Sequence, residues 1–451
     1  PRIMQFVDDS ITCQSTLRGV RAASRCLEAF VTRWQLEVAG QRKRPRFLVF
    51  GATPPAPGEV PEVNGERLRI IQAGESTAVL GSTLDPGLAF EDALRATTRA
   101  VRTEARKVFA SLLSNGFGLP MQARAWTVRI EATVLPGTEI LASCSRGAPA
   151  VMHQLNLAHA DACRVLLAAR PGLLLGQLLP LFAETRAGPR LGTRWAARVV
   201  IAKAGLALLP ENTDLGEVAV GAEEAEGNCW WADAGAVGAI LGISESVKDV
   251  LQASERNREL SATERRTIAQ RYRLRYVRPR VAAYEHRWYV RAASEIREQE
   301  GRPYRNHLRD EGPPGWGIGV GWAPWGPTDW RYFRAWLLAR ISKAIPLIVW
   351  EAGDLPASLP TCPGCAARDA SLAHLVEDCP GTADARIDLE DLTLASALQG
   401  DRDVNVLRKK VRAVGKAVTM AVAGLAERRR AIGTQKTRVV ENAGADAERS
   451  E

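Results

Sequence analysis

Two groups of residues in this sequence have the types and the spacing that metal chemistry requires. The first is a pair of adjacent aspartates, Asp8 and Asp9, in the stretch RIMQFVDDSITC. The second is a set of three cysteines and one histidine between residues 362 and 379. Carboxylates suit hard divalent cations, whereas thiolates and imidazole suit zinc, so the two groups predict two different metal sites.

The paired aspartates need water or a cation beside them, because adjacent like charges repel each other. Aspartate is common in solvated turns, which is one interpretation of the pair. The flanking runs IMQFV and SITC are apolar and β-prone, however, and they place Asp8 and Asp9 at the tip of a half-buried hairpin. At such a tip the pair would bind Mg²⁺ or Mn²⁺, as two-metal polymerases do for phosphoryl transfer.

The cysteine–histidine group has the spacing of a zinc knuckle. Two residues separate the first two cysteines, eight separate the second cysteine from the histidine, and four precede the last cysteine. Pro-Gly between the first two cysteines suits a tight turn, and a short helix would present the histidine and the last cysteine about one turn apart. We therefore expect Zn²⁺ here, with buried free cysteines or a redox pair as the alternative. The predicted ligands are Cys362, Cys365, His374 and Cys379.

A basic segment between Arg265 and Arg291 interleaves nine arginines with tyrosines and tryptophan. Arginines can neutralise phosphates while aromatic rings stack on unpaired bases, so the segment predicts contact with RNA or DNA. A solvated helix whose tyrosines face the core is the alternative, and a second basic run over 402–416 leaves the same two readings open. The candidate nucleic-acid-binding residues are Arg265, Arg266, Arg271, Arg273, Arg275, Arg278, Arg280, Tyr272 and Tyr276.

The surrounding elements follow from hydrophobic periodicity and turn residues. Helical spacing dominates from residue 85 onward, and LAFEDAL (88–94) is interpreted as a helix start. The most apolar stretch, Val165–Phe182, is interrupted by Arg170 and two prolines, so it predicts buried helices and no membrane span. Before these come a strand–turn–strand at 2–13, a helix at 16–37, a strand at 46–50, a Pro/Gly loop at 52–66 and a hairpin at 67–84.

Composition limits the class of protein. The chain has 451 residues, a net charge of +9 and 8 cysteines that lack the spacing of a disulfide scaffold. The positive balance favours a polyanionic partner, and the cysteine usage favours a reducing intracellular compartment, either nucleus or cytoplasm. Tryptophans gathered between 316 and 336 predict a small core ahead of the cysteine cluster.

In their order along the chain, these features resemble the reverse transcriptases of non-LTR (LINE-type) retrotransposons. QFVDDSI is similar to the F/Y-x-D-D box of that family, and GQRKRPRFLVFG is similar to the basic strand that follows the box. AVLGSTLD is similar to the hairpin where palm meets thumb, although Val79 stands where the family has tyrosine. The cysteine–histidine spacing is similar to the knuckle that follows the thumb in the same family.

The resemblance implies an RNA-directed DNA polymerase that performs target-primed reverse transcription on an RNA template and a DNA target. Asp8 and Asp9 would be the catalytic metal ligands, and Lys43 would assist pyrophosphate departure, with Arg44 as the alternative register and a solvated charge as the alternative role. The family needs a further aspartate from an Ala-Phe-Asp box upstream. We therefore expect that an upstream polymerase segment is missing and that residues 1–451 alone do not extend a primer.

The expected fold class is α+β, in which a partial palm of hairpins and a helix precedes a mainly helical thumb and a zinc knuckle. The alternative function is a non-catalytic, zinc-dependent nucleic-acid-binding module from a decayed element. No Pro-Asp…Asp/Glu endonuclease pattern follows Cys379. The expected regions are a palm at 1–85, a thumb at 86–210, an Arg/Trp-rich linker at 211–354, the knuckle at 355–383 and a basic helical tail at 384–451.

Overall fold

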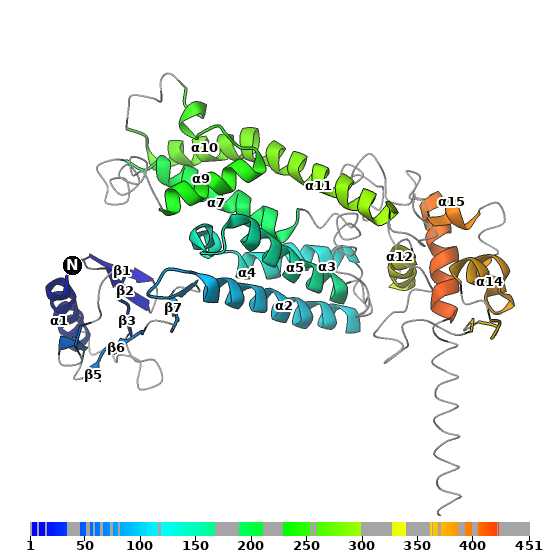
Figure 1. Ribbon diagram of the computed structural model, residues 1–451, viewed down its shortest axis with the longest axis horizontal. Coiled ribbons are helices and arrows are strands. Elements are labelled where there is room, and N and C mark those ends of the chain that lie inside the picture. The colour runs from blue at the N-terminus through cyan, green and yellow to red at the C-terminus, as the bar shows by residue number, and fades with distance from the viewer. Residues whose placement is uncertain are drawn as a thin grey trace, which may run out of the picture.

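A computed structural model of the protein is mostly helical, with strands confined to the N-terminal part of the chain (Figure 1). The residues that the structure describes are 2–6, 9–13, 16–33, 46–50, 55–56, 59–63, 66–72, 75–79, 82–115, 119–166, 189–210, 229–252, 255, 259–298, 327–339, 361–362, 364–368, 371–386, 393–398, 405–421 and 423.

The N-terminal strands form separate two-stranded pairs within the described residues. β1 (Arg2–Phe6) and β2 (Asp9–Cys13) pair antiparallel with Phe6 opposite Asp9, so the two predicted strands are confirmed, while residues 7–8 between them lie outside the described part. The other strands are β3 (Arg46–Phe47), β4 (Glu62–Val63), β5 (Glu66–Arg67), β6 (Arg69–Ile70), β7 (Thr77–Val79) and β8 (Ser82–Leu84). Each of these has only two or three residues, because Pro, Gly and charged residues interrupt the apolar runs.

The predicted helix at 16–37 is observed as α1 (Leu17–Arg33), and residues 34–45 lie outside the described part. The predicted hairpin at 67–84 is observed in its second half, where β7 pairs with β8. Its first half behaves differently, because β6 pairs in parallel with β3. That long-range pairing has no local sequence signal.

Helix α2 (Glu91–Ser114) begins within LAFEDAL, as the sequence predicted. Asp85 holds the turn before it, since its carboxylate accepts the Ala89 N–H at 3.3 Å and the Phe90 N–H at 3.1 Å. Leu88 and Phe90 both adopt positive φ in this turn, an unfavourable conformation that the Asp85 hydrogen bonds stabilise.

The central helices pack around one apolar core, in which α5 runs along α2 and α9 lies against α7 (Figure 1). Trp126 and Trp195 are fully buried in it, and each indole N–H donates a hydrogen bond, to Glu131 and to the Thr138 carbonyl respectively. The helices of this body are α2, α3 (Leu119–Ala125), η3 (Trp126–Glu131), α4 (Ala132–Val134), η4 (Thr138–Ser143), α5 (Ala148–Leu166), α7 (Leu191–Ala207), α9 (Trp230–Leu241), η5 (Lys248–Val250), α10 (Ala262–Tyr272), η7 (Arg273–Val277) and α11 (Arg278–Glu298).

The first turn of α7 is held by a buried ion pair and several hydrogen bonds. Glu285 of α11 accepts the Arg190 N–H at 3.0 Å and the Arg190 guanidinium N–H at 3.0 Å, and it accepts the Thr193 hydroxyl at 2.6 Å. The Arg190 guanidinium also lies 3.8 Å from the ring centroid of Trp288. Arg190 and Glu285 are both buried, so this ion pair and its hydrogen bonds fix α11 against α7.

A second group of helices surrounds the cysteine cluster. It comprises α12 (Pro327–Ala339), η8 (His374–Asp378), η9 (Pro380–Thr382), α14 (Ala383–Arg386), α15 (Leu394–Leu398) and a helix over 405–421. Trp336 is buried and donates to the Ala397 carbonyl at 2.9 Å, so this part of the tryptophan-rich segment does form a core. The 405–421 helix is buried over most of its circumference, and Lys410 of the basic run is itself buried, so Lys409 and Arg412 are the exposed basic residues of this helix.

We expect Glu285→Gln to destabilise the helical body by about 3–5 kcal/mol, because it leaves the buried charge of Arg190 uncompensated. Urea unfolding followed by tryptophan fluorescence measures this loss. Glu295→Gln, on an exposed position of the same helix, should shift the midpoint far less. Equal midpoints for the two variants would contradict a structural role for the Arg190–Glu285 pair.

Candidate metal centre

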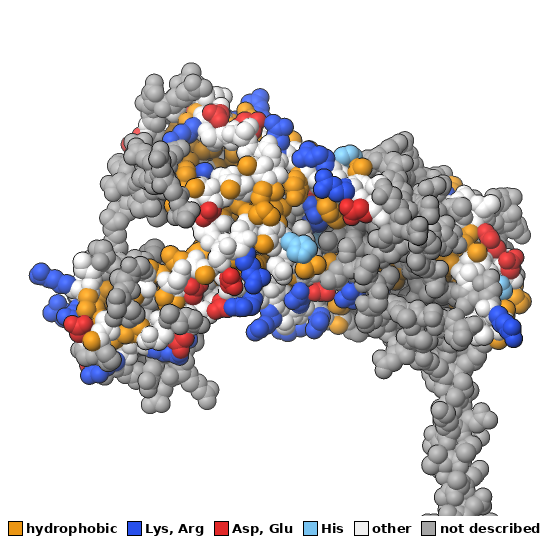
Figure 2. Space-filling view, in the orientation of Figure 1, with side chains coloured by type: hydrophobic (Ala, Val, Ile, Leu, Met, Phe, Trp, Pro, Cys, Tyr) orange, Lys and Arg blue, Asp and Glu red, His pale blue; other side chains and the backbone are white. Residues whose placement is uncertain are grey.

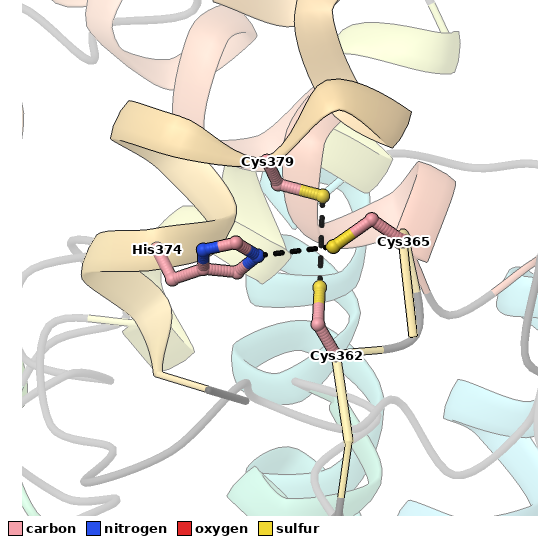
Figure 3. Close-up of side chains that lie close together, drawn as sticks. All are labelled: Cys362, Cys365, His374 and Cys379. Atoms are coloured by element: carbon pink, nitrogen blue, oxygen red, sulfur yellow. Dashed lines mark hydrogen bonds between the residues drawn. The ribbon is translucent and has the colours of Figure 1, made fainter. Parts of the chain in front are cut away.

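The four predicted zinc ligands converge on one point (Figure 3). Their ligand atoms all lie within 4.8 Å of one another, with Cys362 Sγ 3.6 Å from Cys379 Sγ and Cys365 Sγ 3.2 Å from His374 Nε2. Tetrahedral zinc with ordinary bond lengths requires about 3.8 Å between two sulfurs and about 3.6 Å between sulfur and nitrogen. The donor set therefore fits zinc after the closest pairs move apart by a few tenths of an ångström and the widest pair closes by up to about 1 Å.

The first two ligands come from a tight turn. The Ala366 N–H donates to the Cys362 carbonyl at 2.8 Å, the Cys362 N–H donates to the Ala367 carbonyl at 2.7 Å, and Ala366 takes a positive φ of 64°. Gly364 is required by close approach, since a Cβ there would lie 2.7 Å from Cys379 Sγ. The sequence signal for this turn was the Pro-Gly between the two cysteines.

The other two ligands come from the short helix η8, as the sequence predicted. His374 begins it, and Cys379 follows its last residue, with the Cys379 N–H bonded to the His374 carbonyl at 2.7 Å. The Ser371 hydroxyl accepts the His374 N–H at 3.1 Å and so caps the start of this turn. Sequence reasoning missed Ser371, although a serine three residues before a helical histidine is a recognisable capping signal.

The thiols differ in their readiness to ionise. Burial raises the pKa of the Cys362 thiol to about 11. By contrast, the Ala367 N–H, and after it the hydrogen bond with His374, lowers the pKa of the Cys365 thiol to about 7. Zinc binds thiolates and displaces their protons, so a cation at the centre would compensate the negative charge of the buried sulfurs.

The surroundings make this a closed site. Cys362 and Cys379 are fully buried, and Leu375 and Val376 of η8 belong to the apolar core. The Glu377 carboxylate accepts the Leu394 N–H at 3.0 Å, which ties η8 to α15. Four protein ligands leave no open coordination position, so the arrangement suits a structural metal, which when bound would crosslink the turn to η8.

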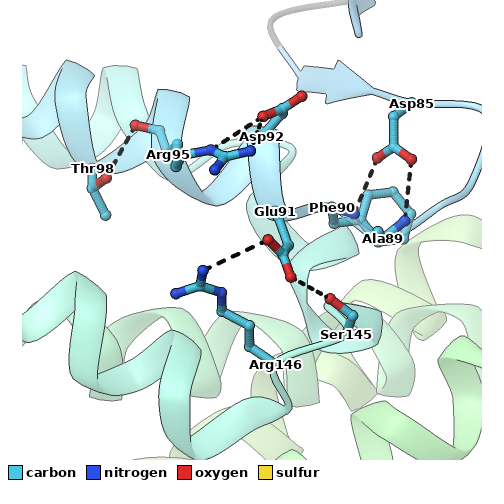
Figure 4. Close-up of polar contacts among 9 residues, drawn as sticks. All are labelled: Asp85, Ala89, Phe90, Glu91, Asp92, Arg95, Thr98, Ser145 and Arg146. Atoms are coloured by element: carbon cyan, nitrogen blue, oxygen red, sulfur yellow. Dashed lines mark hydrogen bonds and ion pairs between the residues drawn. The ribbon is translucent and has the colours of Figure 1, made fainter. Parts of the chain in front are cut away.

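The aspartate pair is described only in part. Asp9 is the first residue of β2, whereas Asp8 and the predicted Lys43 lie outside the described residues. Glu91 and Asp92, the first carboxylates after the strands in α2, are occupied by other partners (Figure 4). Glu91 accepts from the Ser145 hydroxyl at 2.9 Å, and Asp92 accepts from Arg95 Nε at 3.1 Å. Both carboxylates are therefore engaged by other side chains of the protein.

The structure divides the predicted nucleic-acid-binding residues into two classes. Several have partners inside the protein: Arg271 bonds the Glu255 carboxylate at 3.2 and 3.3 Å, Arg280 bonds Glu245 at 3.0 Å, and Arg265 bonds the Leu260 carbonyl at 2.5 Å. Arg266, Arg273, Arg275 and Arg278 are exposed and have no acidic partner among the described residues, whereas Arg280 is exposed but paired.

The prediction that Tyr272 stacks on bases is corrected by its burial. Its side chain is only 3% exposed, its hydroxyl donates to the Glu245 carbonyl at 2.8 Å, and burial raises its pKa to about 12. Tyr276 stacks on Tyr272 with ring centroids 5.8 Å apart, so one of its faces is already covered. Helical spacing puts both rings on the side of α10 and η7 that packs on the loop before η5.

Comparison with known proteins adds no further constraint on this site. No family model matches the chain, and neither a curated protein nor a solved structure does. A separate search of the described helices finds none with the length and apolar character to cross a membrane.

We predict that the purified protein carries about one zinc ion per chain and that Cys365→Ser reduces this content to near zero. Elemental analysis measures the metal, and near-ultraviolet circular dichroism reports the packing of the C-terminal helices, which should loosen when a chelator removes it. Cys26→Ser, at an exposed cysteine of α1, is the matched control and should retain the metal. A full zinc complement in Cys365→Ser would refute the tetrad.

Proposed function

We propose that the chain is part of an RNA-directed DNA polymerase of the non-LTR retrotransposon type, in which zinc stabilises the C-terminal helices and exposed arginines bind nucleic acid. The order of the elements supports this: a hairpin that carries paired aspartates, a helical body and then a Cys₃His tetrad. Target-primed synthesis on an RNA template and a DNA primer would be the activity.

The observation that carries the proposal is the register of the N-terminal hairpin. Phe6 lies opposite Asp9, so only residues 7 and 8 separate the two strands, and Asp9 opens the second strand. Asp9 therefore stands at this end of the strand pair, and Asp8 directly precedes it in the sequence. Mg²⁺ held there would stabilise the charge that develops on oxygens during phosphoryl transfer.

The remaining residues would bind and position the substrate. Arg273, Arg275 and Arg278 are exposed on η7 and at the start of α11, where guanidinium groups can contact successive phosphates. The buried Tyr272 and its contact with Glu245 would hold that surface in place.

A second candidate function is a non-catalytic module that binds nucleic acid. One observation favours it: the Glu91 and Asp92 carboxylates are paired with Arg146 and Arg95 within the protein. In this reading the zinc tetrad and the arginines act as in the first, and the aspartate pair is a solvated turn. Metal binding at the aspartates separates the two candidates.

We expect the protein to bind Mn²⁺ weakly at the aspartate pair, and the double variant Asp8→Asn/Asp9→Asn to lose that binding. Electron paramagnetic resonance of free Mn²⁺ during titration measures it. Glu62→Gln/Glu75→Gln removes the same charge from two exposed positions and should leave the binding unchanged. Identical titrations for both double variants would exclude the aspartate site and leave the non-catalytic module.

A further inference from the structure

Helix α2 carries a row of four arginines along one side. Arg95, Arg99, Arg102 and Arg106 are spaced by four, three and four residues. At 3.6 residues per turn these positions fall within an arc of about 60°, and at 1.5 Å per residue the row is about 16 Å long. We call these four residues the α2 arginine row.

The buried side of α2 determines which way the arginine row faces. Val101, Ala105 and Phe109 are completely buried, and α2 packs along α5 by this side. Arg102 lies at the border, where its Nε donates to the Asp161 carboxylate of α5 at 2.7 Å. The row therefore has a fixed orientation on the surface, and Figure 2 shows Lys and Arg side chains gathered over this part of the helical body.

The row has more positive charge than its neighbours neutralise. Asp92 pairs with Arg95 (Figure 4), and Asp161 is shared between Arg102 and Arg164, whose Nη1 lies 3.3 Å away. Within the part of the chain that the structure describes, no carboxylate pairs with Arg99 or Arg106. Arg99 and Arg106 are thus the two arginines of the row whose charge is open to an external anion.

We propose that the α2 arginine row binds the phosphate backbone of a nucleic acid. This inference rests on the proposed function, because it names a surface for the polyanion that the function requires. A straight row of about 16 Å is long enough to contact about three successive phosphates of one strand, which wind around an axis with a rise of about 3.4 Å per phosphate. Guanidinium groups along a helix contact phosphates without reading sequence.

The composition of the helix distinguishes this partner from an anionic membrane. Helices that lie in a membrane interface insert large apolar side chains beside their basic ones. Among the described side chains of α2 the exposed apolar residues are alanines, and the exposed large apolar residues of the protein lie on other elements. A polar row with small neighbours suits a nucleic-acid backbone.

The test compares two variants with the same change in charge. Arg99→Gln/Arg106→Gln removes the two unpaired arginines of the row, and Arg67→Gln/Arg69→Gln removes two exposed arginines from the strands. Binding of a fluorescent RNA–DNA hybrid is titrated at several salt concentrations. The row variant should reduce the slope of log affinity against log salt by about 1.8 for a duplex and about 1.4 for a single strand.

The strand variant should keep the wild-type slope, and circular dichroism of both variants should match the wild type. A row variant with the wild-type slope would overturn the inference while leaving the proposed function standing. Failure of the wild-type protein to bind any nucleic acid at low salt would overturn both. Equal loss of binding to vesicles containing phosphatidylglycerol would assign the row to a membrane surface instead.

Discussion

The packing of the helical body depends on the buried N-terminus of α7. The first N–H groups of any helix lack partners within that helix. Here the Leu191 N–H donates to His159 Nδ1 at 3.1 Å and the Gly192 N–H donates to Asn156 Oδ1 at 2.9 Å, both on α5. With Glu285 of α11 holding the preceding residue, side chains from two other helices satisfy these donors, so α5, α7 and α11 are fixed together.

This arrangement depends on a neutral histidine. Burial, together with the nearby charges of Arg194 and Arg190, holds the pKa of His159 well below its ordinary value, so Nδ1 remains an acceptor. The His159 ring stacks on Trp126 with centroids 4.4 Å apart. A Cβ at Gly192 would lie 2.4 Å from the Met152 carbonyl oxygen. The backbones of α7 and α5 are therefore in direct contact at this point. Because α2 packs on α5, both exposed arginine surfaces take their orientation from this junction.

The sequence predicts features whose partners lie close along the chain and misses those whose partners lie far away. The cysteine–histidine cluster, the pairing of the first two strands and the start of α2 depend on residues less than twenty positions apart, and all three are observed. Tyr272 and Arg280 were assigned to nucleic acid because nothing local revealed their contacts with Glu245. The sequence left open that the tyrosines face the core, but it did not show which segment of the protein they contact. The spacing of the arginines in the sequence would have been enough to predict the α2 arginine row.

The short separation of the four metal ligands has a consequence for the order of folding. Closing a loop of eighteen residues loses less chain entropy than joining α12 to the helix at 405–421, which are separated by more than sixty residues. The tetrad can therefore assemble before the helices that cover it have met. The hydrogen bond from Trp336 to the Ala397 carbonyl joins α12 to α15, which are also far apart in the sequence. A metal ion held by the four ligands would then act as a nucleus on which the C-terminal helices could condense.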